Sequence, residues 1–359
     1  MDSIIGILKK DWFNLLNKNR CQFHLSALPK VWIVTIYSFK NTKDKKREDV
    51  QFGKAINDTS LDQPPVFILG HWRSGTTLLQ NLMVQDANFV SPNIFECRNP
   101  HTFLVRQNIF EHRRAKAVAA TRPTDNVKIR IDSPAEEEFA VGVMSLMTPL
   151  LGWVFPKNRD HYERYLTFSE VPESEINTWK THYLYFLKKI TYKHKKQLLL
   201  KSPVNTARVK LLLDLFPKAK FIHIHRHPYD VYRSTFKMYR TAVVRSSFQG
   251  KKQRNIEDDI IDHYQRMHQA YFADRALIPD GQLLEVSFSQ LEQEPMGVLR
   301  NIYDYYAFPN FEKVEGNFRN YLEQNQSYQK NIYEPLPERL KKRLQTEWAM
   351  AFENWGYKS

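Results

Sequence analysis

Cysteine is scarce in this chain, and the common metal-binding motifs are missing. The 359 residues include two cysteines, Cys21 and Cys97, and neither a C-x-x-C nor an H-E-x-x-H motif. Two cysteines cannot build a disulfide framework, so we expect a reducing compartment and a cytoplasmic location. His223, His225 and His227 alternate along the chain, but no cysteine or carboxylate lies among them. We therefore expect no bound metal.

Long apolar runs are also missing. The apolar stretch 31–39 is far shorter than the ~20 residues that a membrane-spanning helix needs. The N-terminus lacks the charge order of a secretory signal, because Lys9 and Lys10 follow the first apolar residues instead of preceding them. These absences predict a soluble intracellular protein.

Positive charge and aromatic side chains are abundant. The formal net charge is +14, and 42% of the residues are hydrophobic and 13% aromatic. The basic surplus predicts an anionic partner, although a solvated basic surface explains it equally well. Length and apolar content predict one large α/β domain at 61–310, with helical extensions at 1–60 and 311–359, the second packed on the same domain.

The stretch Val66–Met83, VFILGHWRSGTTLLQNLM, has the pattern of a phosphate-binding unit. Residues 66–69 predict a strand, 70–75 a polar loop bounded by glycines, and 76–86 a helix. The first N–H groups of a helix lack intrahelical acceptors and lie at the positive end of the helix dipole. The unit therefore predicts a cradle for an anionic phosphate group.

The glycine spacing of this loop is that of nucleotide enzymes, but its cation is not. Gly70-x4-Gly75 matches the phosphate loop, whereas Thr76 and Thr77 follow where a lysine is expected. Arg73, inside the loop, is the cation instead. This departure argues against an ordinary ATP-binding loop.

Later segments alternate between strand and helix patterns. We expect strands at 197–200, 219–225 and 283–288, and helices at 174–189, 206–216, 228–239, 256–276 and 295–306. This alternation predicts a central parallel sheet flanked by helices, like that of phosphate-loop nucleotide hydrolases. Ligands of such sheets bind at the carboxyl ends of the strands, where Arg73, Lys201 and Arg226 fall.

The remaining segments have weaker patterns. Residues 4–16 predict an amphipathic helix, which either packs on the main domain, as we favour, or makes peripheral contact with a membrane. The other expectations are a solvated loop at 41–47, a second strand at 89–96, a helix at 100–121, a charged loop at 249–255 and a helical tail at 315–359 anchored by Trp348 and Trp355.

Three motifs, in order along the chain, resemble those of sulfotransferases that use 3′-phosphoadenosine 5′-phosphosulfate (PAPS). They are GHWRSGTTLL, LLLKSP and FIHIHRHPYDVYRS, and the resemblance covers roughly residues 64–305. It is strongest for the branch of tyrosylprotein sulfotransferases and many bacterial sulfotransferases, whose loop reads R-S-G-T-T-L. The resemblance implies in-line transfer of a sulfuryl group to a hydroxyl. Such transfer suits a loop without the lysine, because the group in flight carries less charge than a γ-phosphoryl and needs no magnesium.

The resemblance also implies residue roles. The 5′-phosphosulfate would be held by the loop residues Arg73, Ser74, Gly75, Thr76 and Thr77. The 3′-phosphate would be held by Arg226 and Ser234, at the family's spacing of eight residues. From the sequence alone, Arg226 could instead pair with Asp230 to cap a helix. Arg73 and Lys201 would be catalytic, and Lys201 would stabilise charge on the bridging oxygen as the sulfuryl group leaves.

The general base is open between two carboxylates. Glu96, at the end of the second expected strand, lies near where tyrosylprotein sulfotransferases keep a glutamate. Glu138 belongs to a D-x-P-x-E-x-E stretch that resembles one in related bacterial sulfotransferases. Glu136, in the same stretch, is explained as the partner of Ser133 in a capping box. We therefore predict Glu96 or Glu138 as the group that takes the acceptor's proton, a contribution of about 10²–10⁴-fold.

Two other functions fit parts of the sequence. A phosphate-loop kinase or NTPase using ATP and magnesium fits the glycine spacing but not the missing lysine. A basic binding protein fits the net charge, but no reader motif is evident, and we expect no nucleic-acid partner. The acceptor stays open among a carbohydrate, a lipid and a peptide tyrosine, and segments 149–165 and 239–253 are expected to line its side. The sequence also leaves a homodimer open.

Overall fold

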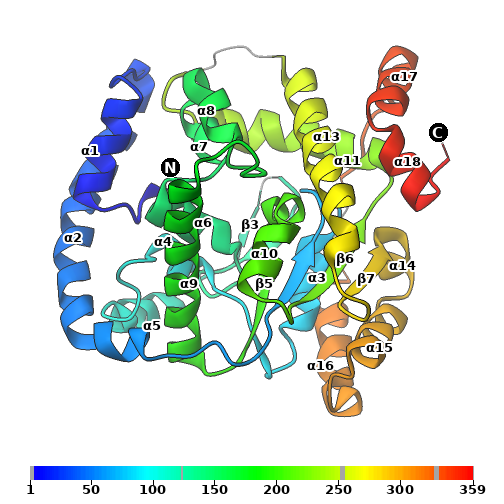
Figure 1. Ribbon diagram of the computed structural model, residues 1–359, viewed down its shortest axis with the longest axis horizontal. Helices are drawn as coiled ribbons and strands as arrows, with labels where there is room; N and C mark the ends of the chain where they lie inside the picture. The colour runs from blue at the N-terminus through cyan, green and yellow to red at the C-terminus, as the bar shows by residue number, and fades with distance from the viewer. Residues whose placement is uncertain (1–3, 123, 251–254, 327–330, 359) are drawn as a thin grey trace.

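A parallel five-stranded sheet forms the centre of the computed structural model, which describes residues 4–122, 124–250, 255–326 and 331–358. The strand order is β2-β5-β1-β6-β7 (Figure 1). The strands are β1 (Val66–Leu69), β2 (Phe89–Val90), β5 (Gln197–Lys201), β6 (Lys220–His225) and β7 (Leu283–Ser287). The register pairs Val66 with Leu199 on one side and with Lys220 on the other. The predicted parallel sheet is confirmed.

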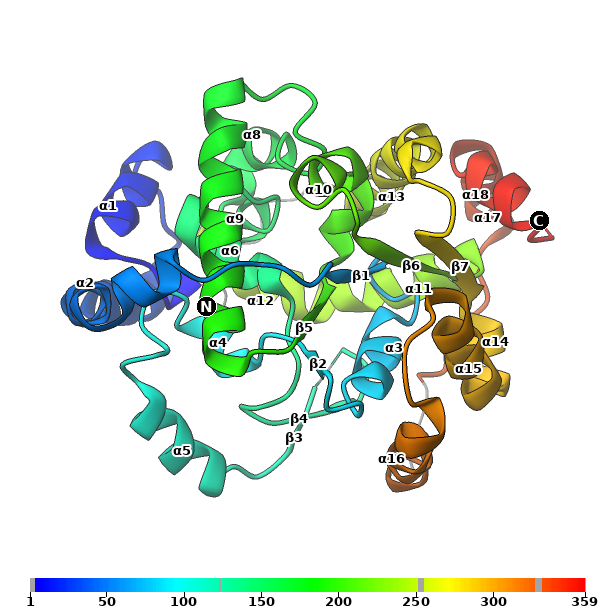
Figure 2. The same ribbon diagram turned by 60° about the horizontal axis from the view of Figure 1, so that its bottom comes forward.

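Helices cover both faces of the sheet, and alternate residues of β1 enter two separate cores. Phe67 and Leu69 pack in one core cluster, whereas Val66 and Ile68 pack in another. Figure 2 shows α9 and α10 on one side of the sheet and α3, α15 and α16 on the other. The two-sided burial explains why β1 reads as a continuous apolar run.

The helices of this framework are α3 (Thr76–Met83), α4 (Ile94–Arg98), α5 (Gln107–Ala115), α6 (Glu137–Ser145), α7 (Leu151–Val154), α8 (Arg159–Glu163), α9 (Glu173–His194), α10 (Val209–Leu215), α11 (Pro228–Met238), α12 (Val244–Ser246), α13 (Ile256–Asp274), α14 (Phe288–Gln293), α15 (Pro295–Tyr306), α16 (Phe311–Gln324), α17 (Glu338–Glu347) and α18 (Ala349–Trp355). A small hairpin joins β3 (Ala120–Thr121) to β4 (Lys128–Ile129). The expected helix at 206–216 is a short 3-10 turn, Pro203–Ala207, followed by α10.

The N-terminal segment packs on the main domain. It consists of α1 (Lys9–Lys18), a 3-10 turn at Leu25–Ala27 and the long α2 (Leu28–Asn57). Ile4, Trp12 and Leu15 are buried in the core cluster that also contains residues of β1 and α9. The apolar side chains expected at 4–16 are therefore used for packing inside the protein.

The prediction of a loop at 41–47 is wrong, because these residues lie in the middle of α2. The Asn41 side chain donates to the carbonyl oxygens of Ile5 and Ile7, at 2.8 and 3.0 Å. Asp44 forms a largely buried ion pair with Arg106 at 2.7 Å. The polar run is thus held by tertiary contacts that local sequence does not reveal.

Predictions between residues 89 and 136 also need correction. The second strand ends at Val90, and Glu96 lies inside α4 rather than at a strand end. The helix expected at 100–121 is reduced to α5. The capping box at Ser133 is absent: α6 begins at Glu137 with Glu136 as its N-cap, and the Ser133 hydroxyl accepts the backbone N–H of Arg130.

The C-terminal helices close the opposite edge of the molecule from α1 and α2 (Figure 1). Trp348 is fully buried and donates its indole N–H to the carbonyl of Ile261 at 3.1 Å. Trp355 packs flat on the ring of His225, with centroids 4.9 Å apart. Both expected anchors are confirmed. The charged loop expected at 249–255 lies partly outside the described residues, since 251–254 are not among them. Among the described residues, no helix is long and apolar enough to cross a bilayer.

Candidate active site

The loop between β1 and α3 has a backbone that only glycine accommodates at its two ends. Gly70 has φ of 137°, and a Cβ there would lie 2.4 Å from the carbonyl oxygen of Ile224. Gly75 has φ of 104°, and a Cβ would lie 2.3 Å from the ring of Phe288. Arg73 also adopts a left-handed φ, 74°. Strained backbone of this kind persists where the surroundings fix a functional geometry.

A cavity of about 1000 Å³ opens in front of this loop. Its lining includes Arg73, Gly75, Thr76 and Thr77 of the loop and α3, and Arg226 from the end of β6. The free N–H groups at the start of α3 add an anion-attracting backbone to these cations. The residues therefore fit a phosphorylated ligand of nucleotide size.

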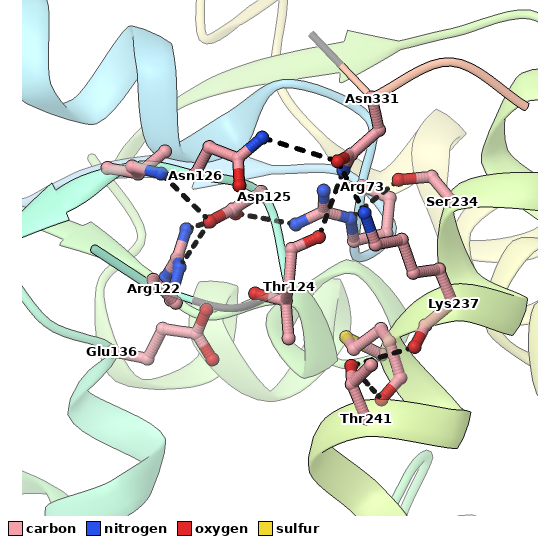
Figure 3. Close-up of polar contacts among 12 residues, drawn as sticks. Arg73, Arg122, Thr124, Asp125, Asn126, Glu136, Ser234, Lys237, Thr241 and Asn331 are labelled. Carbon is pink, nitrogen blue, oxygen red and sulfur yellow. Dashed lines mark hydrogen bonds and ion pairs between the residues drawn. The ribbon is translucent and has the colours of Figure 1, made fainter. Parts of the chain in front are cut away.

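Arg73 is the centre of the polar network drawn in Figure 3. Its Nε donates to the Ser234 hydroxyl at 2.7 Å, and its Nη1 lies 2.6 Å from Asp125 Oδ2. Asp125 also pairs with Arg122 at 2.5 Å. Burial alone would raise the pKa of Asp125, but the two arginines together hold it below its ordinary value. The guanidinium of Arg73 is thus already paired with a carboxylate of the protein, that of Asp125.

Arg226 and Ser234 meet this network from the strand end and the following helix. Arg226 Nη1 donates to the carbonyl oxygen of Arg73 at 3.2 Å, and its guanidinium lies over the Phe288 ring at 4.5 Å. Its Nε is buried without a hydrogen-bond partner among the described residues and is 3.7 Å from Asp230. An arginine nitrogen in this condition fits an anionic ligand.

The alternative for Arg226 is met in part, because Arg226 pairs with Asp230 at 3.7 Å but does not cap the helix. The N-cap of α11 is His227, whose ring accepts the N–H of Tyr229. Ser234, 1% exposed, lies two turns into the same helix and accepts from both Arg73 and Tyr333. Arg226 and Ser234, the pair that the sequence singled out for the 3′-phosphate, therefore both contact Arg73.

Lys201 ends β5 and forms an ion pair with Glu136. The Nζ–Oε1 distance is 2.6 Å, and 3% of the lysine side chain and 14% of the glutamate side chain are exposed. The lysine's amino group is buried against this carboxylate at the carboxyl edge of the sheet.

Comparison with known proteins agrees with this geometry. Residues 64–313 match the sulfotransferase family. The chain is also 31% identical, over 353 residues, to omega-hydroxy-beta-dihydromenaquinone-9 sulfotransferase Stf3 of Mycobacterium bovis and of Mycobacterium tuberculosis, covering 98% of this chain and 90% of each relative. The chain belongs to the sulfotransferase family. The resemblance stated from three motifs is confirmed.

Solved structures show that the sulfotransferase fold extends over nearly the whole chain. Sulfotransferase STF9 of Mycobacterium avium superposes with a TM-score of 0.68 at 18% identity, covering 97% of this chain and 96% of its own. Sulfotransferase STF1 of Mycobacterium tuberculosis superposes with a TM-score of 0.65 at 15% identity, covering 96% and 93%. At these identities the likeness concerns the fold. It includes the N- and C-terminal helices that the motifs left unexplained.

In this sulfotransferase, Glu96 is not among the residues that line the cavity, and it contacts a lysine and a histidine. Its Oε1 is 2.8 Å from Lys193 Nζ and 2.8 Å from His194 Nε2, and its Oε2 accepts the Asn93 N–H. Its side chain is fully buried. Burial would raise the pKa of Glu96, but His194 and Lys193 together lower it. These contacts suit a residue that fixes α4 to α9.

The other two glutamates of the acidic stretch point into the protein. Glu138 forms a two-pronged ion pair with Arg208, at 2.7 and 3.0 Å, and both side chains are buried. Glu137 accepts from the Asn205 side chain at 2.6 Å and from the backbone N–H of Lys201 at 3.2 Å. Glu136 is therefore the member of the stretch whose carboxylate pairs with the ammonium of Lys201.

Sequence reasoning missed several residues of this site. Asp125 lies in a segment that had no motif, and its role depends on a tertiary contact with Arg73. Asn331 and Tyr333 reach the site from the C-terminal tail, where Asn331 donates to the carbonyl of Thr124 at 3.2 Å. No local signal could have found these three, because each contact spans at least 50 residues of chain.

Proposed function

We propose that this sulfotransferase transfers the sulfuryl group of PAPS directly to a hydroxyl of a lipid-soluble acceptor. One observation carries the proposal: the glycine-bounded loop, the Arg226–Ser234 pair and the Lys201–Glu136 pair lie at neighbouring strand ends of one sheet. The loop and Arg226 supply cations for the two charged ends of the donor. Lys201 and Glu136 supply a cation and a carboxylate for the reacting end.

The donor would bind across the network around Arg73. The N–H groups of α3 and the hydroxyls of Thr76 and Thr77 would hold the 5′-phosphosulfate, and Arg226 with Ser234 would hold the 3′-phosphate. Arg73 is paired with Asp125 at 2.6 Å. An anionic donor therefore competes with Asp125 for this guanidinium, and binding requires that the pair loosen.

The transfer step requires one bond to form and one to break. The acceptor oxygen bonds to sulfur while the bond from sulfur to the bridging phosphate oxygen breaks, and adenosine 3′,5′-bisphosphate leaves. Glu136 takes the acceptor's proton, and the ammonium of Lys201 stabilises charge on the departing oxygen. We place Glu136 in this role ahead of Glu96 and Glu138, because both of those carboxylates are enclosed by cations away from Lys201.

The acceptor class rests on the relatives and on aromatic side chains beside the loop. The Stf3 relatives are named for a hydroxylated menaquinone derivative. The two segments expected to line the acceptor side, 149–165 and 239–253, meet where the ring of Trp153 contacts that of Tyr239 at 6.1 Å. Trp153 also contacts Trp72 of the donor loop, at 5.7 Å. Apolar, ring-lined surroundings favour a lipid-soluble hydroxyl over a carbohydrate.

Calorimetry with adenosine 3′,5′-bisphosphate tests the donor site. The wild type is expected to bind it without added magnesium, and Arg226→Ala is expected to bind about 10–100-fold more weakly, because a charged hydrogen-bond donor is lost. Arg319→Ala serves as the matched control, since Arg319 pairs with Glu315 on the exposed side of α16. Wild type that binds only ATP with magnesium would instead favour a phosphate-loop kinase or NTPase.

A further inference from the structure

Large apolar side chains form an exposed stripe on the first turns of α2. Trp32 is 68% exposed and Ile36, one turn further on, is 54% exposed. We define the apolar stripe as Leu28, Trp32, Ile36 and Phe39 of α2, with Phe13 of α1. The rings of Phe13 and Phe39 contact each other edge to face, at 6.3 Å. Figures 1 and 2 both show α2 at the outer edge of the molecule.

This stripe is separate from the side of α2 that holds the helix in the fold. Val34, Ser38 and Asn41 face inward and are fully buried. The spacing of 28, 32, 36 and 39 puts the apolar stripe on one other face of the helix. The helix therefore has its core contacts without the stripe, and burial of the stripe needs something beyond the described chain.

The next turns of the same face are basic. We define the basic turns as the exposed residues Lys40, Lys43, Lys46 and Arg47. Asp44 and Glu48 are turned inward, where they pair with Arg106 and Lys189. Asp44 also lies 3.5 Å from Arg47, and the exposed Asp49 pairs with Lys45. At the stripe itself, the ammonium of Lys9 lies 4.6 Å from the Phe39 ring. The face thus has an apolar end followed by exposed positive charge.

We propose that this face of α2 docks the enzyme on a bilayer with anionic headgroups. A helix that presents tryptophan and aliphatic side chains next to lysines binds in the plane of the interface, with its apolar side inserted at the headgroup boundary. The basic turns would then contact lipid phosphates, and each lysine near an anionic surface strengthens binding. The positive charge of the basic turns complements anionic headgroups, and the partner of this face is therefore an anionic lipid surface.

The stripe is also connected to the acceptor side of the active site. Lys30 Nζ donates to the carbonyl oxygen of Arg245 at 2.8 Å, and the His24 N–H donates to that of Phe248 at 2.9 Å. Both acceptors belong to the segment 239–250 that follows the helix of Ser234. Docking through the stripe would hold this segment against the bilayer. The docking is argued from the surface of α2 alone. Its connection to the acceptor side rests on the lipid-soluble acceptor proposed above.

Vesicle sedimentation with the full chain tests the docking. The wild type is expected to sediment with phosphatidylglycerol–phosphatidylcholine vesicles and not with phosphatidylcholine alone. Trp32→Ser/Ile36→Ser is expected to lower the partition coefficient about tenfold or more. Lys40→Gln/Lys43→Gln is expected to lower it about thirtyfold. The matched control is Leu277→Ser, which removes a 52% exposed leucine outside α2 and is expected to partition like the wild type.

Three results would overturn the docking. They are absence of wild-type binding to the anionic vesicles, binding unchanged by the Trp32/Ile36 or the Lys40/Lys43 substitutions, and a solution dimer that Trp32→Ser/Ile36→Ser dissociates. The last would mean that a second copy covers the stripe. Binding of adenosine 3′,5′-bisphosphate is expected to stay at the wild-type level in all these variants, so failure here is distinguishable from failure of the donor site.

Discussion

Three consecutive glutamates, 136–138, have different surroundings although their sequence contexts are nearly the same. Glu137 and Glu138 are buried at the start of α6, and Glu138 is held by Arg208. Glu136 precedes the helix and faces Lys201. Our proposal places the base at Glu136 because its carboxylate faces the ammonium of Lys201, whereas those of Glu137 and Glu138 are held inside the protein.

Substitution of two of these glutamates is expected to separate stability from catalysis. Glu138→Gln leaves Arg208 buried with its charge unpaired, so the free energy of unfolding should fall by about 3–5 kcal/mol. Glu136→Gln keeps an amide oxygen for the buried Lys201 ammonium, and the Glu136 side chain is 14% exposed, so the fall should be smaller, about 1–3 kcal/mol. Urea unfolding of both variants checks the difference. Equal stability losses would mean that the two carboxylates have similar structural roles.

At the residue scale, the sequence predicted that Arg73, Lys201 and Arg226 lie at neighbouring strand ends, but it did not predict the partners of the glutamates. Arg73, Arg226 and Ser234 could be singled out because fixed spacings after a strand determine where they lie. The sequence predicts Glu136 as the partner of Ser133 in a capping box, because the local spacing fits that role. The contact with Lys201 overrides it, and that contact joins positions 65 residues apart.

The strand–loop–helix unit around Gly75 shows how an element prepares a binding site before any ligand arrives. Gly75 is the N-cap of α3 and has a left-handed backbone conformation. This turn aims the first N–H groups of α3 at the cavity. The side of Gly75 is closed by Phe288, the first residue of α14. The loop therefore depends on an element more than 200 residues away for its shape.

Gly75→Ala is expected to abolish measurable binding of adenosine 3′,5′-bisphosphate. The added Cβ would meet Phe288 at 2.3 Å, and the φ of 104° is strained for alanine. Calorimetry measures the loss. Gly316→Ala in α16 is the matched control, because a Cβ there meets nothing within 4 Å, and it should raise stability by about 0.5–1 kcal/mol. Binding retained in Gly75→Ala would show that the loop tolerates another backbone conformation.

The junction of α8 and α13 makes stability depend on pH. Burial would raise the pKa of Glu163, but His263 and Arg159 together lower it to about 2. Because the folded-state pKa lies below the ordinary value of 4.5, the stabilisation is complete above about pH 5 and is lost as pH falls toward 2. The loss should approach about 3 kcal/mol. Chemical unfolding across this range should give a flatter pH profile for Glu163→Gln; identical slopes for variant and wild type would contradict the assignment.

At the scale of the whole molecule, the chain forms its core from both ends. Trp12 of α1 lies in the same core cluster as Phe67 of β1, and Trp348 of the tail packs with residues of α13. The sequence predicted the parallel sheet, because buried strands and helices alternate there. It did not predict that 41–47 lies inside α2, since Asn41 and Asp44 are buried by partners distant in the chain. Charge patterns alone cannot distinguish a solvated loop from such a helix.

Sulfuryl transfer by wild type and Glu136→Gln tests the central claim most directly. Radiolabelled PAPS would be offered with a hydroxylated prenylquinone, and transfer rates compared at equal occupancy of the donor site by PAPS. Our account predicts labelled product from the wild type and a rate lower by about 10²–10⁴-fold in Glu136→Gln, with unchanged nucleotide affinity. Wild type that labels no hydroxyl acceptor, or a Glu136→Gln variant that transfers at the wild-type rate, would contradict it.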